Sequence, residues 1–318
     1  MSIPTNESCS SRLLNPGYII VACVLVLTLL GLCVLYSATA QLGPDPFFFL
    51  RRQVVWLGIA LVAGVVCSLM NLDSLRKFFV PVTILSLVAL VLVLIPGIGT
   101  EVNGARRWIR MGFFNIQVSE FAKLGLVFTL ACYLGSNQRR IEYFWSGFVV
   151  PCLIIGIFSA LIIVQPDYGT AGLCAAVGFT LLFLAGVRLR FVIPAFFSAL
   201  GIFGVAIYLN PLRLQRIVSF LDVEGNRAEG SYQLWQAILG FGAGGLNGVG
   251  LGNGRQQMAF LPEAHTDFIF AVGGEELGFA FTAGVLLLFF ILFVVSMFHL
   301  RKAPDMYQFL LVAGALFM

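Results

Sequence analysis

The feature that most constrains this chain is the recurrence of long apolar runs. Each run spans about 17 to 22 residues, which is enough for a helix to cross roughly 30 Å of hydrocarbon. Of the 318 residues, 59% are hydrophobic and only 11% are charged, whereas soluble domains are roughly half apolar and about a quarter charged. The pattern predicts an all-α, polytopic transmembrane helical bundle, because a β-barrel would show short alternating segments instead.

These runs predict eight complete spans and the start of a ninth. We expect the spans near residues 18–37, 53–71, 78–96, 118–135, 147–164, 171–187, 191–209 and 276–299, with a ninth from Met306. The ninth run is still apolar at Met318, which indicates a C-terminally truncated sequence. We therefore expect one integral membrane domain over residues 1–318, with a large extracytoplasmic loop at about 210–266.

The distribution of Lys and Arg between the loops predicts the orientation of the chain. With the N-terminus inside, the inner and outer segments each hold nine such residues, so the raw count does not decide. Long loops carry little weight in the positive-inside rule. Leaving out residues 210–266 removes four outer charges, which gives nine inside against five outside and predicts a cytoplasmic N-terminus.

Composition argues against several classes of partner and site. The net charge of +4 is too small to indicate nucleic-acid binding. The two histidines lie far apart and six of the seven cysteines lie in apolar runs, which disfavours a His/Cys metal site or a disulfide frame. No G-K-[ST] motif occurs, so a P-loop is excluded. A hard cation bound by oxygen ligands remains open, with no ligand set assigned.

Basic residues gather between the third and fourth predicted spans, on the outer side. Arg106, Arg107 and Arg110 flank Trp108, whose amphipathic ring suits a membrane interface. One interpretation is anchoring to lipid headgroups. The other is binding of an anionic ligand, such as a phosphate, at the outer surface.

Charged residues also open the fourth predicted span. Glu120 and Lys123 are three residues apart, so they share a helix face and can form an ion pair. Such a pair in or near a membrane is costly unless it faces the bundle interior or a wet cavity. It therefore indicates either a clamp between helices or one wall of a polar cavity.

The connection between the fifth and sixth predicted spans reads Gln165-Pro166-Asp167-Tyr168-Gly169-Thr170. Its Pro and Gly predict a tight turn. Asp167 is placed to cap the following helix, and the alternative is an additional acid facing the same outer cavity.

The large outer loop combines a predicted helix with a glycine-rich block. Residues 231–241 (SYQLWQAILGF) are expected to form an amphipathic or re-entrant helix. Residues 240–254 then contain eight glycines, including a G-x-G-x-x-G pattern that no predicted strand precedes, which disfavours a dinucleotide site. Glycines permit an irregular backbone with exposed N–H groups, which suit an anion or a lipid headgroup.

Residues 261–271 (LPEAHTDFIFA) place acids beside an apolar run. Asp267 precedes Phe268 and Ile269, while Glu263 and His265 lie just before it. One interpretation is helix capping by Thr266 or Asp267. The alternative is an acid whose pKa is raised by apolar neighbours, which would make it usable as a general base.

Taken together, these motifs resemble the SEDS family (shape, elongation, division and sporulation proteins), the bacterial peptidoglycan polymerases. The resemblance covers nearly the whole chain, in order. It is carried by Asn103-Gly104-Ala105-Arg106-Arg107-Trp108, Ser119-Glu120 with Lys123, residues 165–170, Tyr232-Gln233, the glycine-rich block, LPEAHTDFIFA and Glu275-Glu276-Leu277-Gly278. Residues 44–53 and Glu263-Ala264-His265 look more like the division (FtsW) branch than the elongation (RodA) branch.

The resemblance implies ten transmembrane helices and a glycosyl transfer reaction. Lipid II would be polymerised into glycan strands, with release of undecaprenyl pyrophosphate, in septal wall synthesis. The family's essential aspartate falls on Asp267 and its Glu/Lys pair on Glu120 and Lys123. The substrate-binding residues predicted with them are Arg106, Arg107, Gln165, Asp167 and His265. Mg²⁺ or Mn²⁺ is a candidate cofactor.

The resemblance also implies a setting for the chain. We expect a multi-pass protein of the bacterial inner membrane, with an extracytoplasmic active site at the division septum. The expected partners are a class B penicillin-binding protein, which is a transpeptidase, and other division proteins. The alternatives are a lipid II flippase, an elongation-type polymerase, and a scaffold for division partners.

Overall fold

The chain folds into two compact units in this computed structural model. Unit 1 comprises Met1–Leu69 and Ala206–His299, and unit 2 comprises Met70–Val205 and Leu300–Met318. The structure describes residues 16–40, 45–102, 105–111, 114–227, 230–256, 261–262 and 264–318. Of the motif residues named in the sequence analysis, Pro44, Asn103, Gly104 and Glu263 lie outside the described ones. The single domain over residues 1–318 stays a prediction.

Helices dominate both units, as the sequence predicts. Unit 1 contains α2 (Pro16–Thr39), α3 (Phe48–Leu69), α10 (Pro211–Leu221), α11 (Tyr232–Gly244) and α12 (Ile269–Leu300). The helices of unit 2 are α4 (Leu72–Leu75), α5 (Phe79–Leu92), α6 (Val118–Ser136), α7 (Val150–Val164), α8 (Tyr168–Leu184), most of α9 (Leu189–Tyr208) and α13 (Met306–Phe317). Short 3₁₀ or π turns, η1 (Arg76–Phe78), η2 (Gln138–Arg140) and η3 (Phe144–Val149), lie between them.

The predicted spans are confirmed as apolar helices. Within the described residues, seven helices are long and apolar enough to cross a membrane, and α8 and α13 are shorter apolar helices. The largest shift in a boundary concerns the predicted span 276–299, because α12 already begins at Ile269. The predicted helix at 231–241 is α11.

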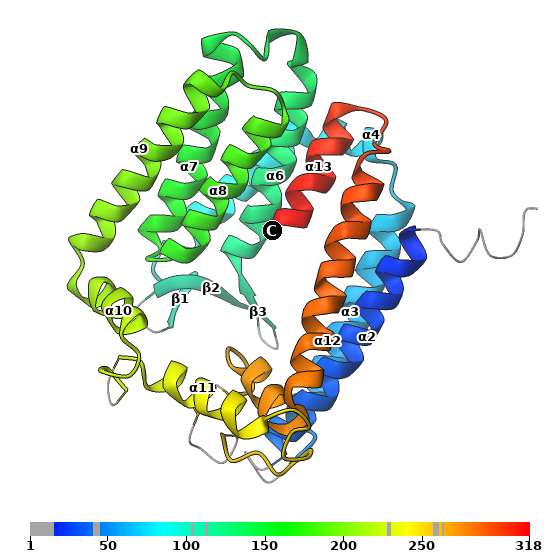
Figure 1. Cartoon of the computed structure of the whole chain (residues 1–318). Helices are drawn as coiled ribbons and strands as arrows, with labels where there is room; N and C mark the ends of the chain where they lie inside the picture. Colours follow the sequence, from blue (N-terminus) through cyan, green and yellow to red (C-terminus); the bar gives the residue numbers. More distant parts are fainter. Residues whose placement is uncertain are drawn as a thin grey trace, which may run out of the picture. The chain divides into compact units, whose positions relative to one another are not determined.

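Unit 2 is built around α6. This helix packs against α5, α7, α8 and α13 (Figure 1), and most of its residues are buried. Small residues allow the close approach of α13. A Cβ at Gly135 would lie 2.8 Å from the Cβ of Tyr307, and one at Gly314 would lie 2.4 Å from a methyl group of Val127.

A small antiparallel sheet precedes α6, an element that the all-α prediction did not include. Its strands are β1 (Gly99–Val102), β2 (Ala105–Met111) and β3 (Phe114–Gln117), in the order β1-β2-β3. Trp108 of β2 is paired with Thr100 on one side and Gln117 on the other. Because β2 pairs with β3 and α6 follows β3 directly, the sheet holds the arginines of β2 close to the start of α6.

In unit 1 the glycine-rich loop packs against a break in α12. Gly278 interrupts this helix with φ = 74°, a conformation that favours glycine. A Cβ at Gly278 would lie 2.3 Å from the backbone nitrogen of Gly248. The loop and the break exchange backbone hydrogen bonds, among them Val249 N to Glu275 O and Phe279 N to Gly245 O.

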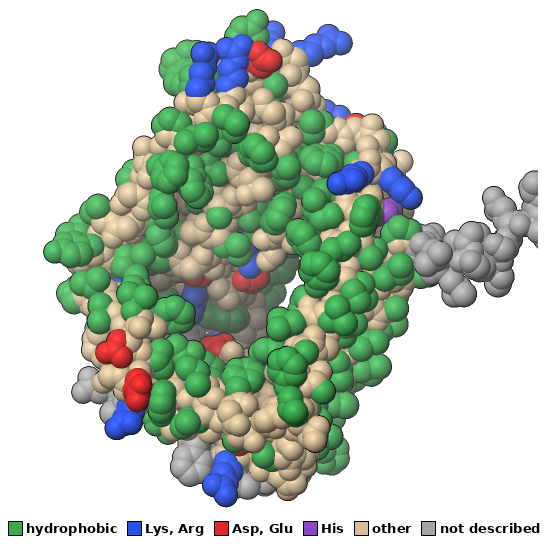
Figure 2. All heavy atoms as spheres, viewed as in Figure 1, with side chains coloured by type: hydrophobic (Ala, Val, Ile, Leu, Met, Phe, Trp, Pro, Cys, Tyr) green, Lys and Arg blue, Asp and Glu red, His purple; other side chains and the backbone are tan. Residues whose placement is uncertain are grey.

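The surface matches that of a multi-pass membrane protein. Hydrophobic side chains cover most of the visible helical surface, whereas Lys and Arg gather at helix ends (Figure 2). One such end of unit 2 carries Arg139 and Arg140 on η2 and Arg188 before α9. Apolar helices with charged ends suit a bilayer, whose hydrocarbon core excludes charge.

Candidate active site

Asp267 lies in a turn directly before α12. The turn covers residues 264–268, and α12 begins two residues after Asp267. Asp267 is exposed, and no hydrogen bond to its carboxylate is found within the described part of the chain. Its neighbour His265 packs its ring against that of Phe49, with the centroids 4.8 Å apart. The geometry leaves the Asp267 carboxylate accessible to a ligand.

Two adjacent acids, Glu275 and Glu276, lie buried in α12. Their exposed fractions are 2% and 0%. Glu275 accepts hydrogen bonds from the backbone N–H groups of Arg255 at 2.9 Å and Gln256 at 3.1 Å. Glu276 Oε1 accepts from the Ser37 hydroxyl at 2.8 Å and from Gly252 N–H at 3.1 Å. The two carboxylates therefore attach the end of the glycine-rich loop to α12, and Ser37 adds α2 to the same network.

This network gives the glycine-rich block a structural task. The N–H groups of Val249, Gly250 and Gly252 bond to carbonyl or carboxylate oxygens of α12. These three donors are therefore used within the chain, and the predicted role of the block in binding an anion or a headgroup stays a prediction. The sequence marks Glu275 and Glu276 as unusual because acids are rare within apolar helices. Their partners lie 19 to 239 residues away, so local patterns do not identify them.

In unit 2, Asp167 has several partners. Its Oδ1 accepts from Thr170 N–H at 3.2 Å, which caps α8 as the sequence predicts. Its Oδ2 lies 3.5 Å from Nη1 of Arg107 and also accepts weaker hydrogen bonds from Gln117 and Ser119, at 3.3 and 3.4 Å. The capping interpretation is confirmed, and the same carboxylate also joins β2, β3 and α6.

The two predicted arginines have different partners. Arg107 pairs with Asp167, while Arg106 donates to Glu101 of β1 at 3.2 Å. Adjacent residues of a strand point to opposite faces of the sheet, which explains the separation. The Nε of Arg107 is buried and has no hydrogen-bond partner in the described residues. Its hydrogen-bonding capacity is therefore left unsatisfied by the described residues.

The ion pair predicted at the start of α6 is confirmed. Lys123 Nζ lies 2.8 Å from Glu120 Oε2, with exposed side-chain fractions of 14% and 54%. Ser119, directly before Glu120, is bonded to Asp167. Glu120, Lys123, Asp167 and Arg107 thus belong to one end of unit 2. The choice between a cavity wall and a helix clamp stays open for the Glu120–Lys123 pair.

Gln165 is placed as a link between helices. It is fully buried and donates from Nε2 to the carbonyl of Leu90 at 3.0 Å. Its Oε1 has no partner among the described residues. The contact favours a packing role, and its assignment to substrate binding stays a prediction.

The described residues do not supply a metal site. Among them, no group of three or more His, Cys, Asp or Glu side chains is placed to hold an ion. Taken separately, unit 1 presents an accessible carboxylate, and unit 2 presents a guanidinium, an ammonium and two carboxylates. A carboxylate suits proton abstraction, and the two cations of unit 2 suit the binding of phosphate.

Comparison with known proteins gives close relatives over almost the whole chain. A probable peptidoglycan glycosyltransferase FtsW of Trichlorobacter lovleyi is 38% identical over 307 residues, which cover 95% of this chain and 81% of the relative. The stage V sporulation protein E of Bacillus subtilis is 38% identical over 317 residues, which cover 96% and 84%.

Solved structures of related proteins are also similar to this chain over most of its length. A chain of a peptidoglycan synthase complex, whose structure concerns the coordination of polymerization and crosslinking, matches with a TM-score of 0.73 and 26% identity, covering 94% of this chain and 81% of that chain. The rod shape determining protein RodA of Thermus thermophilus matches with a TM-score of 0.66 and 26% identity, covering 95% and 79%. A family model described as cell cycle protein, for FtsW, RodA and SpoVE, matches residues 18–318. The chain therefore belongs to the FtsW/RodA/SpoVE family of cell cycle proteins, the SEDS family.

Proposed function

We propose that this chain is a peptidoglycan glycosyltransferase that polymerises lipid II into glycan strands and releases undecaprenyl pyrophosphate. The relatives named as probable peptidoglycan glycosyltransferases support the reaction class. The structural observation that carries the proposal is the position of Asp267. An exposed carboxylate directly before a 32-residue apolar helix suits a substrate with a sugar head and a lipid tail.

Asp267 is the proposed general base. The incoming sugar hydroxyl must lose its proton as it attacks the anomeric carbon, and a carboxylate within hydrogen-bond reach can accept that proton. The carboxylate has no partner among the described residues to compete for it. His265 is assigned to substrate binding beside it, on the same turn.

Unit 2 supplies the proposed anion-binding groups. The leaving pyrophosphate carries concentrated negative charge, which cationic hydrogen-bond donors stabilise. Arg107 is the leading candidate because its buried Nε has no partner in the described residues. Lys123 is 14% exposed and is held by Glu120. Asp167 orients the Arg107 guanidinium. Arg106, on the same strand, is assigned to binding of the substrate headgroup.

The proposed setting is septal wall synthesis at the inner membrane. Curated relatives named FtsW support the division branch. We place the N-terminus in the cytoplasm and the active site on the extracytoplasmic face, from the loop charges. A class B penicillin-binding protein is the proposed partner, supported by the similarity to a chain of a peptidoglycan synthase complex, and other division proteins are expected with it. A requirement for Mg²⁺ or Mn²⁺ stays a prediction, which a chelator assay tests.

The test is polymerisation of fluorescent lipid II by the full-length protein, together with its partner, in proteoliposomes. Asp267→Asn is expected to lower the rate by about 10² to 10⁴, the usual contribution of a general base. Glu224→Gln is the matched control, because Glu224 is an exposed acid of the same outer segment and loses the same charge. If Asp267→Asn polymerises at the parent rate, Asp267 is not the base.

The same preparation separates the polymerase from a lipid II flippase. Accessibility of labelled lipid II to an external reagent reports transport, and gel analysis of glycan strands reports polymerisation. Transport without strands from the parent protein would reject the proposed function in favour of a flippase.

A further inference from the structure

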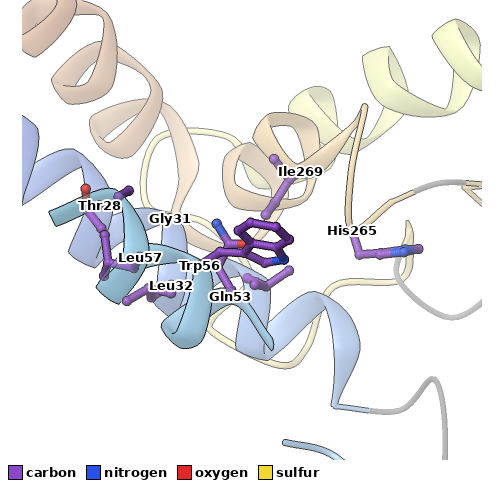
Figure 3. Close-up of a pocket in the computed structure, with 10 residues that line it drawn as sticks. Thr28, Gly31, Leu32, Gln53, Trp56, Leu57, His265 and Ile269 are labelled. Carbon is purple, nitrogen blue, oxygen red and sulfur yellow. The ribbon is translucent and has the colours of Figure 1, made fainter. Parts of the chain in front are cut away.

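A crevice lies in unit 1 between α2, α3 and the start of α12. Its volume is about 540 Å³, within the range of small-molecule sites. The lining residues of α2 and α3 are Thr28, Gly31, Leu32, Leu35, Gln53, Trp56, Leu57 and Ala60, and His265 and Ile269 complete the wall. The Trp56 ring stands at the centre of this group, with Ile269 beside it (Figure 3).

The crevice runs from the end of the helices toward their middle. Helix α2 ends at Thr39, and Leu35 lies one turn before that end. Helix α3 begins at Phe48, and Gln53 lies in its second turn. Thr28 and Ala60 lie seven residues deeper along each helix, which corresponds to about 10 Å. Gln53 and His265 mark the polar mouth, where the His265 side chain turns away from the other lining residues (Figure 3). The walls beyond Gln53 are mainly apolar.

Small residues and an exposed helix keep the crevice accessible from the side. A Cβ at Gly31 would meet no atom within 4 Å, so the glycine leaves space there. None of the residues of α3 is buried. In a bilayer this helix faces hydrocarbon, so that a lipid chain can enter between α2 and α3 without unpacking a core.

The mouth of the crevice adjoins the proposed catalytic turn. His265 and Ile269 line the crevice, and each lies two residues from Asp267. Arg52, next to Gln53, is exposed and has no ion-pair partner in the described residues. A polar headgroup at the mouth beside Gln53 and His265, with a hydrocarbon chain along the apolar walls, matches the lining of the crevice.

We propose that this crevice binds the hydrocarbon chain of the lipid-linked substrate, which holds its sugar head beside Asp267. The inference rests on the proposed function, because the reaction determines that the chain is a polyprenyl phosphate derivative. The crevice lies next to the turn that carries Asp267, which favours the substrate as its occupant. A bulk phospholipid could bind in any apolar groove and would not require this position.

Filling the crevice tests the proposal. Undecaprenyl phosphate binding to the purified full-length protein is measured by native mass spectrometry, for the parent, Gly31→Phe and Gly58→Phe. Both glycines are helical and have no atom within 4 Å of an added Cβ, but only Gly31 lines the crevice. Gly31→Phe is expected to weaken binding about tenfold or more, because it displaces buried chain atoms, while Gly58→Phe binds like the parent.

Two competition outcomes decide the identity of the occupant. With labelled undecaprenyl phosphate bound to the protein, unlabelled undecaprenyl phosphate is expected to displace it at a much lower concentration than phosphatidylglycerol does. Equal displacement by phosphatidylglycerol would make the crevice a general lipid groove and overturn the proposal. Parent-like binding by Gly31→Phe would overturn it as well.

Kinetics separate this inference from the proposed function. With full-length lipid II, Gly31→Phe should raise KM and leave kcat near the parent value. With a lipid II analogue that has a short prenyl chain, Gly31→Phe and the parent should behave alike. Equal losses on both substrates would contradict the crevice. A parent protein that polymerises neither would reject the proposed function, while the binding comparison would still decide where the chain binds.

Discussion

Two apolar helices of similar length, α6 in unit 2 and α3 in unit 1, have opposite environments. In the most apolar 18-residue window of each helix, 67% of the residues of α6 are buried, against 0% for α3. Their mean hydropathies over these windows are 1.4 and 1.8, so the less apolar helix is the buried one. Helices in a bilayer associate through close packing and polar contacts, since lipid tails are as apolar as leucine. Hydropathy therefore identifies both spans, and it does not predict which one forms the core.

Truncation of a leucine on each helix gives the largest expected contrast. Leu130 of α6 is fully buried and Leu61 of α3 is 54% exposed. Leu130→Ala should lower the free energy of unfolding by about 2–5 kcal/mol, because it leaves a cavity. Leu61→Ala should change it by about 0.5 kcal/mol or less. Unfolding in a denaturing-detergent titration measures both, and equal losses would refute the contrast between the helices.

The buried acids of the two units differ in a comparable way. Asp167 in unit 2 faces a guanidinium, whereas Glu276 in unit 1 accepts only from a hydroxyl and a backbone N–H among the described residues, and its Oε2 has no partner there. Glu276→Ala should cost about 1–3 kcal/mol, because the buried Ser37 hydroxyl loses its acceptor and the Gly252 N–H keeps only the Ser37 oxygen.

Glu276→Gln is the matched control, since it retains an acceptor oxygen and should lose less stability than Glu276→Ala. Hydrogen exchange at the Gly252 amide reports the same contact and should accelerate more in the alanine variant. Identical exchange in both variants would mean that the carboxylate does not hold the glycine-rich loop.

The smallest expected effect concerns a surface pair at one end of unit 2. The hydrogen bond from Arg188, together with its positive charge, lowers the pKa of Glu142 below 4.5. A lowered folded-state pKa stabilises the fold above the unfolded value, and the contribution is lost as the pH falls through the folded value. Arg188→Ala should therefore reduce Tm slightly at pH 7, with the difference from the parent shrinking below pH 4.5. A difference that grows on acidification would contradict this assignment.

Much of the candidate site follows from local sequence. The Glu120–Lys123 pair and the Asp167 cap are confirmed because residues three apart on a helix, or within its first turn, are neighbours whatever the rest of the chain does. The start of α12 was placed seven residues too late, at 276. The described helix includes Glu275 and Glu276, whose burial depends on partners distant in the sequence.

The sequence by itself determined the membrane class and the approximate spans, because hydrocarbon thickness and helix periodicity act on contiguous residues. It also indicated the family, through short motifs that occur in order along the chain. The tertiary structure decided which helices are buried, that Arg107 meets Asp167, and that Ser37 meets Glu276 across 239 residues. It also formed the sheet before α6 and the crevice between α2 and α3. These features depend on contacts between distant segments, whose pairing no local pattern specifies.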